Sequence, residues 1–251
     1  MRPTVTAIIP TFNEAHHITE AIASVAWCDE VVVVDSFSTD ATPELVERSG
    51  AKLLQHEYRS PAEQKNWAIP HAQSEWILFL DADERITEAL HQEMETVLCE
   101  TKHEAYWIYR KNHFMGQEVK HSGWQSDKVI RLFKKGSCTY ALVAVHEEMV
   151  CRSSVGVLKE RMLHYTYKDF DHYMEKFDRY TTWSAKDRNG RTPKVTLYHL
   201  WVKPSFRFFR HYILKLGILD GKVGFIISYL SAYSVFLRYL KLDRIRKGEN
   251  L

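Results

Sequence analysis

Residues 30 to 40 read EVVVVDSFSTD, and this stretch decides the fold. Four consecutive valines are typical of a parallel strand covered on both faces, because β-branched side chains pack well there. The segment Thr42-Pro43-Glu44 then predicts a helix with Thr42 as its N-cap and proline at its first position. Gly50 suits the end of that helix. The stretch therefore predicts a strand followed by a helix.

The same alternation extends to both sides of this stretch. Thr4 to Pro10 is typical of a buried strand, and apolar residues between 18 and 25 recur at helical spacing. A strand is predicted at Lys52 to Leu54, a helix over Ala62 to Ala68 and another strand over Trp76 to Leu80. Strand starts fall roughly every 22 to 26 residues, the spacing of βαβ units. The first hundred residues thus predict a doubly wound, mostly parallel α/β sheet.

Composition and charge indicate what kind of protein this is and where it works. With 251 residues, 45% hydrophobic and 26% charged, the chain is ordinary for a globular protein. Residues 201 to 251 hold ten Lys and Arg against three Asp and Glu, net +7, which leaves a net charge of −5 for the first 200. Four well-separated cysteines without a CxxC pair predict reduced thiols, and the N-terminal apolar run is too short for a signal peptide. We expect a cytoplasmic protein.

Polar clusters follow three of the predicted strands. They are Thr11-Phe12-Asn13-Glu14, Asp35-Ser36 and Asp81-Ala82-Asp83. In doubly wound sheets ligands bind outside the carboxyl ends of the strands, so we expect the three clusters to converge on one crevice. The chain has no GxxxxGK[ST] and no GxGxxG after the first strand, which disfavours P-loop and dinucleotide-binding proteins.

The acidic cluster predicts a divalent cation site. Two carboxylates one residue apart suit Mg²⁺ or Mn²⁺, and a cation there would bridge two phosphates. An isolated DxD is more often a solvated turn, but its place after an apolar strand and beside two other polar strand ends favours the metal. Asp35 could accept a hydrogen bond from a base N–H, or it could simply close a turn. Thr11 and Asn13 could contact base or ribose.

Several motifs resemble a known family. Residues 8–14 (IIPTFNE), 31–40 (VVVVDSFSTD), 64–66 (QKN) and 80–84 (LDADE) are similar to the ordered motifs of inverting GT-A (family 2) glycosyltransferases. Within them the chain most resembles the lipopolysaccharide core glucosyltransferase group. That similarity continues in Gly123-Trp124, residues 127–133 (DKVIRLF), Val145-His146-Glu147, residues 164–167 (HYTY), Lys203-Pro204 and Gly221-Lys222.

The resemblance implies roles for the nucleotide-binding residues. Those implied to contact the base and ribose are Pro10, Thr11, Asn13, Glu14 and Asp35. Lys65 and Asn66 would lie near the phosphates or donor sugar, and Asp81 and Asp83 would hold the metal and the diphosphate. Many members of the family have a second Asp where this chain has Ser36, so uracil recognition would rest on Asp35 alone.

Inversion by single displacement needs a general base for the acceptor hydroxyl. We favour Asp127, which lies in a segment that resembles the acidic motif of the family upstream of Arg131; the alternative for Asp127 is a surface salt bridge. Glu147 is a rival base, although His146 and Glu147 could equally form a structural pair. We assign Trp124, Arg131 and His146 to the sugar-binding side, with core packing an equal alternative for Trp124.

The basic tail predicts an interaction surface. Apolar and basic residues interleave from Pro204 to Leu219, and the charge-free run from Val223 to Leu237 is fifteen residues, short of the about 20 that a spanning helix needs. This favours a pair of interfacial helices on an anionic membrane over a hairpin packed on protein or on a second subunit. No nucleic-acid module accompanies the charges, so we predict no nucleic-acid partner.

Together these features predict a GT-A catalytic domain at 1–200, with a nucleotide-binding half (1–100) and an acceptor-side half (101–200), and a helical extension at 201–251. The resemblance implies transfer of a hexose, glucose from UDP-glucose, to a lipid-linked saccharide such as the lipopolysaccharide inner core, at the inner face of the cytoplasmic membrane. The sequence does not decide whether the protein forms a homo-oligomer. The alternatives are a sugar-phosphate nucleotidyltransferase, which would normally show a glycine-rich basic loop after the first strand, and a non-catalytic membrane-associated nucleotide-binding scaffold.

Overall fold

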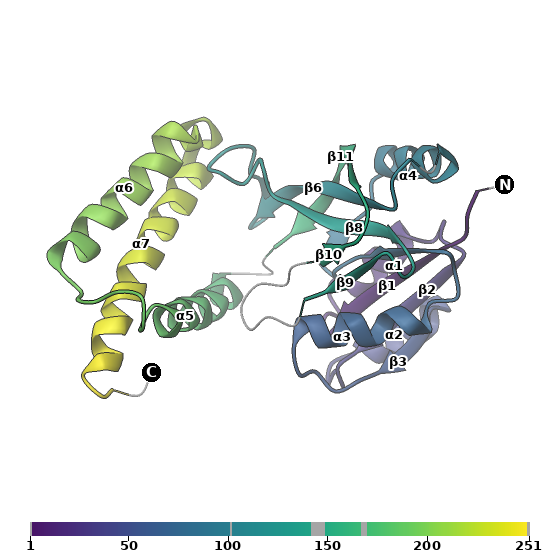
Figure 1. Cartoon of the computed structure of the whole chain (residues 1–251), viewed down its shortest axis with the longest axis horizontal. Helices are drawn as coiled ribbons and strands as arrows, with labels where there is room; N and C mark the ends of the chain where they lie inside the picture. The colour runs from purple at the N-terminus through teal and green to yellow at the C-terminus, as the bar shows by residue number, and fades with distance from the viewer. Residues whose placement is uncertain (1, 101, 142–148, 167–169, 250–251) are drawn as a thin grey trace. The chain divides into compact units, whose positions relative to one another are not determined.

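The computed structural model describes residues 2–100, 102–141, 149–166 and 170–249 (Figure 1). The chain forms two compact units. Unit 1 comprises Met1–Lys111 and Asp127–His164, and unit 2 comprises Asn112–Ser126 and Tyr165–Leu251.

Most of unit 1 is a mixed sheet with the strand order β3-β2-β1-β4-β8-β6-β11-β5, and β7, which belongs to unit 2, pairs with the end of β6. The N-terminal strands β1 to β4 pair in parallel, as the βαβ spacing predicts, whereas β8 pairs antiparallel with β4 and β6, and β11 with β5. The strands are β1 (Val5–Thr11), β2 (Glu30–Asp35), β3 (Lys52–Gln55), β4 (Trp76–Phe79), β5 (Glu84–Arg85), β6 (Ala105–Phe114), β7 (Gln117–Glu118), β8 (Lys128–Lys134), β9 (Cys138–Tyr140), β10 (Met149–Cys151) and β11 (Val155–Tyr165).

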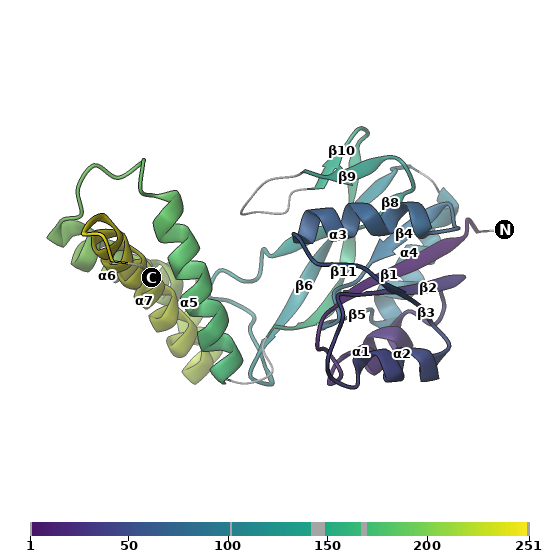
Figure 2. The same ribbon diagram turned by 90° about the horizontal axis from the view of Figure 1, so that it is seen from below.

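Helices cover both faces of this sheet and enclose two apolar cores. One core joins the sheet to α1, α2 and α4 through residues such as Ile18, Val46 and Met94; the other joins it to α3 and the β9–β10 pair through Ala68 and Tyr140. Figure 2 shows α3 with β9 and β10 on one side of the sheet and α1 with α2 on the other. The helices are α1 (Ile18–Ser24), α2 (Thr42–Ser49), α3 (Pro61–Ala68), the 3₁₀ turn η1 (Ile69–His71) and α4 (Glu88–Glu100).

Two local predictions differ from the structure. Thr42 is the first residue of α2 rather than its N-cap: the N-cap position is Ala41, and the Asp40 carboxylate before it accepts the Thr42 N–H at 3.0 Å. The expectation of reduced thiols is wrong for Cys138 and Cys151, which form a disulfide. The antiparallel pairing of β9 with β10 sets these two residues directly opposite each other, with a Cα–Cα distance of 4.1 Å.

Unit 2 is a helical assembly centred on α7 (Gly221–Arg246). Lys241 of α7 is buried and donates to Asp178, Thr181 and Thr182 of α5. A Cβ at Gly224 would lie 1.8 Å from the Gly217 carbonyl oxygen, so only glycine permits this close turn. The other helical segments are α5 (Phe170–Asp187), η2 (Tyr198–Val202), α6 (Lys203–Phe209), η3 (Arg210–Leu214) and η4 (Gly217–Asp220). Figure 1 shows α6 and α7 side by side.

The division between the units falls elsewhere than at the predicted boundary after residue 200. Helix α5 belongs with the tail because its apolar side packs on α7, where Phe177 stacks on Tyr233 at 5.8 Å. The segment Asn112–Ser126 joins the same unit through Phe114 and Val119, which cluster with Val223 and other apolar residues of α7. Helix α5 and the residues from Val195 to Leu200 therefore share a core with the extension.

Candidate active site

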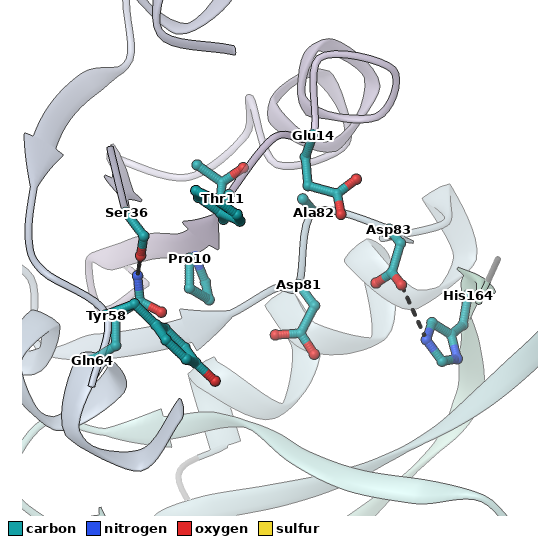
Figure 3. Close-up of a pocket in the computed structure, with 11 residues that line it drawn as sticks. Pro10, Thr11, Glu14, Ser36, Tyr58, Gln64, Asp81, Ala82, Asp83 and His164 are labelled. Carbon is teal, nitrogen blue, oxygen red and sulfur yellow. Dashed lines mark hydrogen bonds and ion pairs between the residues drawn. The ribbon is translucent and has the colours of Figure 1, made fainter. Parts of the chain in front are cut away.

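A cavity of about 270 Å³ lies in unit 1 at the carboxyl ends of β1, β2 and β4 (Figure 3). The structure brings together members of all three predicted polar clusters there. The lining residues are Pro10, Thr11, Phe12, Glu14, Ser36, Tyr58, Gln64, Asp81, Ala82, Asp83 and His164. The convergence follows from parallel pairing, because Thr11 and Asp35 are register partners at the ends of β1 and β2.

The loop after β1 is fixed to the loop after β2. Asn13 adopts a left-handed conformation, with φ at +54°, and its side-chain oxygen accepts the Thr39 N–H at 2.8 Å. In return the Asn13 N–H donates to Ser38 Oγ at 2.8 Å, and the Glu14 N–H donates to Thr42 Oγ1 at 2.9 Å. Asn13 therefore shapes the cavity rim, and it is absent from the lining.

Asp35, the predicted base contact, is fully buried and does not line the cavity. Its carboxylate accepts the Ser38 N–H at 2.9 Å and the Ser38 hydroxyl, with Gln55 Nε2 at 3.4 Å. The Asp35 side chain thus closes a turn by accepting hydrogen bonds from the residue three positions later, which is the structural alternative that the sequence left open for Asp35.

Ser36 and Gln64 take the place on the cavity wall that Asp35 was expected to occupy. Gln64 Nε2 donates to Ser36 Oγ at 2.6 Å, and both side chains are nearly buried (Figure 3). This bond leaves the Ser36 hydroxyl hydrogen and Gln64 Oε1 for a ligand. Phe12 and Tyr58, each about half exposed, add two aromatic rings to the lining.

Asp81 is held by buried cations. Arg131, which is 3% exposed, donates to the Asp81 carboxylate and to Glu84 Oε1, the latter at 2.7 Å, and Lys65 Nζ lies 3.4 Å from Asp81. Burial by itself raises the pKa of Asp81, but the charges of Arg131 and Lys65 outweigh it and hold that pKa well below its usual range. Burial lowers the pKa of Arg131, yet Asp81 and Glu84 more than compensate and raise it.

Asp127, the favoured base, lies in a second ion pair beside this group. Both carboxylate oxygens accept from the Arg110 guanidinium, at 2.9 Å from Nε and 2.8 Å from Nη2. Arg110 Nη1 also lies 3.4 Å from Glu84, so the two pairs are linked. A carboxylate engaged on both oxygens by a guanidinium is a weak base, because the charged form is stabilised.

Asp83 and His164 form the cavity wall farthest from Ser36 in Figure 3. Asp83 Oδ2 lies 3.6 Å from His164 Nε2, and the pairing of His164 with Glu84 across β11 and β5 brings the imidazole there. Among the described residues no group of three or more His, Cys, Asp or Glu side chains could hold a metal ion. A carboxylate and an imidazole nevertheless fit a cation whose other ligands are substrate phosphates and water, as Mg²⁺ sites commonly have.

The remaining predicted residues lie in different surroundings. The Asn66 side chain links α3 to β9. Its Oδ1 accepts the Tyr140 N–H at 2.9 Å, and its Nδ2 donates to the Tyr140 carbonyl at 2.8 Å. Trp124 belongs to unit 2, where it packs edge-on against Phe114. His146 and Glu147 lie outside the described residues.

Sequence reasoning gave no role to several residues of this site. Arg85 donates to the Ala82 and Glu84 carbonyls at 2.8 and 2.7 Å and so fixes the acidic turn. For Arg110 and Tyr58, no motif or spacing in the sequence indicated a place in the site. Gln64 and His164 lie in motifs that the family resemblance includes, and this was the signal that could have identified them.

Comparisons with known proteins agree with this architecture. The Staphylococcus aureus TarS 1–349 crystal structure, also solved in complex with UDP-GlcNAc, matches with a TM-score of 0.51 at 18% identity, covering 98% of this chain and 92% of that one. A Rickettsia felis glycosyltransferase is 28% identical, covering 98% of this chain and 92% of the relative. The Rhizobium meliloti lipopolysaccharide core biosynthesis glycosyltransferase LpsC is 27% identical, covering 93% and 92%.

The fold is therefore of the GT-A type, as the resemblance implied. The sequence model of Glycosyl transferase family 2 matches residues 6–156, which include every described residue that lines the cavity except His164. The chain belongs to this family, and the enzyme class is glycosyltransferase.

Proposed function

We propose that this protein transfers a hexose, glucose from UDP-glucose, with inversion to a lipid-linked saccharide of the lipopolysaccharide core. The observation that carries the proposal is the single cavity onto which the polar ends of β1, β2 and β4 open. Family membership supports the reaction class, UDP-GlcNAc bound to TarS supports a UDP-sugar donor, and the similarity to LpsC supports the acceptor. The donor sugar comes from the resemblance to the glucosyltransferase group.

In this proposal Ser36 and Gln64 recognise the base. The Ser36 hydroxyl donates to a uracil carbonyl and Gln64 Oε1 accepts its N3–H, while Phe12 and Tyr58 supply aromatic surface for the ring. Asp35 acts indirectly, because it holds Ser38 and through it the loop that carries Asn13.

Asp83 and His164 would hold Mg²⁺ or Mn²⁺ together with the donor's phosphates. Such a cation neutralises charge that develops on the departing diphosphate. Lys65 and Arg131 lie beside Asp81, which lines the cavity, and would supply permanent positive charge near the diphosphate. Their contribution is electrostatic and needs no proton transfer.

The acceptor proton requires a base, for which we keep two candidates. Asp127 would accept a proton only after Arg110 releases one of its oxygens. Glu147 is the second candidate on the strength of its motif. We place the reaction at the inner face of the cytoplasmic membrane, where the acceptor would be anchored.

Calorimetry and turnover test this proposal. We expect UDP to bind with Mn²⁺ or Mg²⁺ and to bind more weakly after chelation, and UDP to be released from UDP-glucose when truncated lipopolysaccharide core acceptors are added. A panel of other UDP-hexoses is the control for the donor. Tight binding with no turnover on any donor and acceptor pair would support the non-catalytic scaffold instead.

A further inference from the structure

The helical run from Tyr198 to Leu214 presents apolar side chains to solvent. It comprises η2, α6 and η3 in direct succession. Most of its exposed apolar residues recur three or four positions apart, with Trp201-Val202 and Ile213-Leu214 as adjacent pairs, and together they form an exposed apolar stripe. This outer stripe, with the turn that follows it, consists of Tyr198, Trp201, Val202, Phe206, Phe209, Ile213, Leu214, Leu216, Ile218 and Leu219. Trp201 is 67% exposed and Phe206 59%, and a contiguous patch of this kind indicates a binding surface.

Cations of the same run bond to α7 on the opposite face. Lys203 Nζ donates to the Tyr239 hydroxyl at 2.9 Å, and Arg207 Nε donates to Ser231 Oγ at 3.0 Å. Both acceptors are neutral, so these bonds add no negative charge. Phe208 and Tyr212 of the run also pack on Phe225 of α7, so the run carries apolar side chains toward α7 as well as toward solvent.

The charge around the outer stripe indicates the chemistry of its partner. Residues 188 to 219 hold seven Lys and Arg and no Asp or Glu. Arg191 pairs with Asp187, and the excess of cations that remains, combined with apolar and aromatic side chains, suits an anionic lipid surface. A second copy of the chain fits poorly, because a symmetric contact would set the same cations against one another.

Helix α7 is the segment that composition alone would assign to the membrane. Among the described residues it forms the one helical stretch, Gly217–Arg246, that is long and apolar enough to span a bilayer. Many of its apolar side chains, however, are buried within unit 2, where Val235 and Leu242 pack in a core with Ala185 of α5, while Phe225 and Tyr229 are exposed. Lys241 is buried against α5 as well. Packing between helices therefore explains the buried part of the apolar character of α7.

We infer that the outer stripe lies in the plane of an anionic leaflet, with Trp201, Phe206 and Phe209 at the acyl boundary, and that α7 stays within the protein. The inference rests on the proposed function in taking the acceptor to be membrane-bound, and it adds the element and the lipid chemistry. Lys and Arg at the edges of the stripe reach the headgroups, as long basic side chains do at interfaces.

Vesicle co-sedimentation of the full chain tests this. We expect binding to phosphatidylcholine vesicles that contain phosphatidylglycerol, weak binding to pure phosphatidylcholine, and release by high salt and by alkaline carbonate. The double variant Trp201→Ser/Phe206→Ser should lower the vesicle partition coefficient by about tenfold or more. The matched control Tyr180→Ser/Trp183→Ser removes two aromatic residues of α5 that are about half exposed, and it should bind as the parent does. Substitutions are preferred to deletion, because removing α7 would expose the apolar side of α5.

UDP calorimetry on the same variants separates this inference from the proposed function. Normal UDP affinity with lost vesicle binding supports the inference, and it does so even if no turnover is found. Equal vesicle binding by both double variants and the parent would overturn it. So would retention after carbonate treatment, which would indicate that α7 spans the bilayer, or a change from oligomer to monomer without any vesicle binding, which would indicate a second copy as the partner.

Discussion

Arg131→Met tests the ion pairs that position the acidic turn. In the parent chain Arg131 donates to both Asp81 and Glu84 while nearly completely buried. Removing one partner of a buried ion pair costs about 3–5 kcal/mol, since the remaining charge is left uncompensated. We take the lower end, about 3 kcal/mol, because Lys65 and Arg110 stay within 3.4 Å of the two carboxylates and Asp81 is 32% exposed. At about 2–4 °C per kcal/mol this predicts a fall in Tm of roughly 6–12 °C.

The pH dependence of that difference gives a second measurement. The folded-state pKa of Asp81 lies below its unfolded value of about 3.9. Its contribution to stability is therefore full above that unfolded value and is lost as the pH falls toward the folded one. Circular dichroism melts should show the gap between parent and Arg131→Met narrowing below about pH 4.

Two control variants sharpen the test. Arg131→Lys keeps the charge without the planar fork and should lose less than Arg131→Met. Adding Glu84→Gln to Arg131→Met should restore part of the lost Tm, because it neutralises one of the two carboxylates that lose Arg131 as a partner. A Tm for Arg131→Met within about 2 °C of the parent at neutral pH would refute the reasoning, since it corresponds to 1 kcal/mol or less.

Three further predictions concern the ligands. Asp83→Asn should abolish the metal-dependent part of UDP binding, measured by calorimetry with and without chelator, while the Tm stays near the parent value; full metal-dependent affinity would exclude Asp83 as a ligand. Asp127→Asn should leave donor binding near normal and lower kcat about a hundredfold; if Glu147→Gln gives that pattern instead, the base is Glu147. Ser36→Ala and Gln64→Leu should each weaken UDP binding by roughly tenfold and reduce the preference for UDP over CDP. Unchanged affinities would show that other residues recognise the base.

The parallel half of unit 1 could be predicted because its signals are local. The valine run ends at Asp35 in both prediction and structure, and Gly50 ends α2 with φ at +76°. The convergence of Thr11, Ser36 and Asp81 follows from parallel pairing once the strands are known. Family membership and the GT-A fold are likewise confirmed.

Other features depend on contacts that no local pattern encodes. His164 reaches the cavity through antiparallel pairing with a strand about eighty residues earlier in the chain. Cys138 and Cys151 meet only because β9 pairs with β10. For Asp35 the local signal was present but ambiguous, since an acid after a strand with Ser38 three residues later suits both a ligand contact and a side-chain turn.

The two carboxylates of the acidic motif have different surroundings, and this has a consequence for donor binding. Asp81 pairs with Arg131 and Lys65, whereas Asp83 lies beside the imidazole of His164. A diphosphate bound beside Asp81 would compete with it for those two cations, because both are anions. We therefore expect part of the attraction for the donor to be offset by loss of the Asp81 ion pairs. Asp81→Asn should consequently weaken UDP binding less than Asp83→Asn does, and the opposite order in calorimetry would show that Asp81, rather than Asp83, is the main metal ligand.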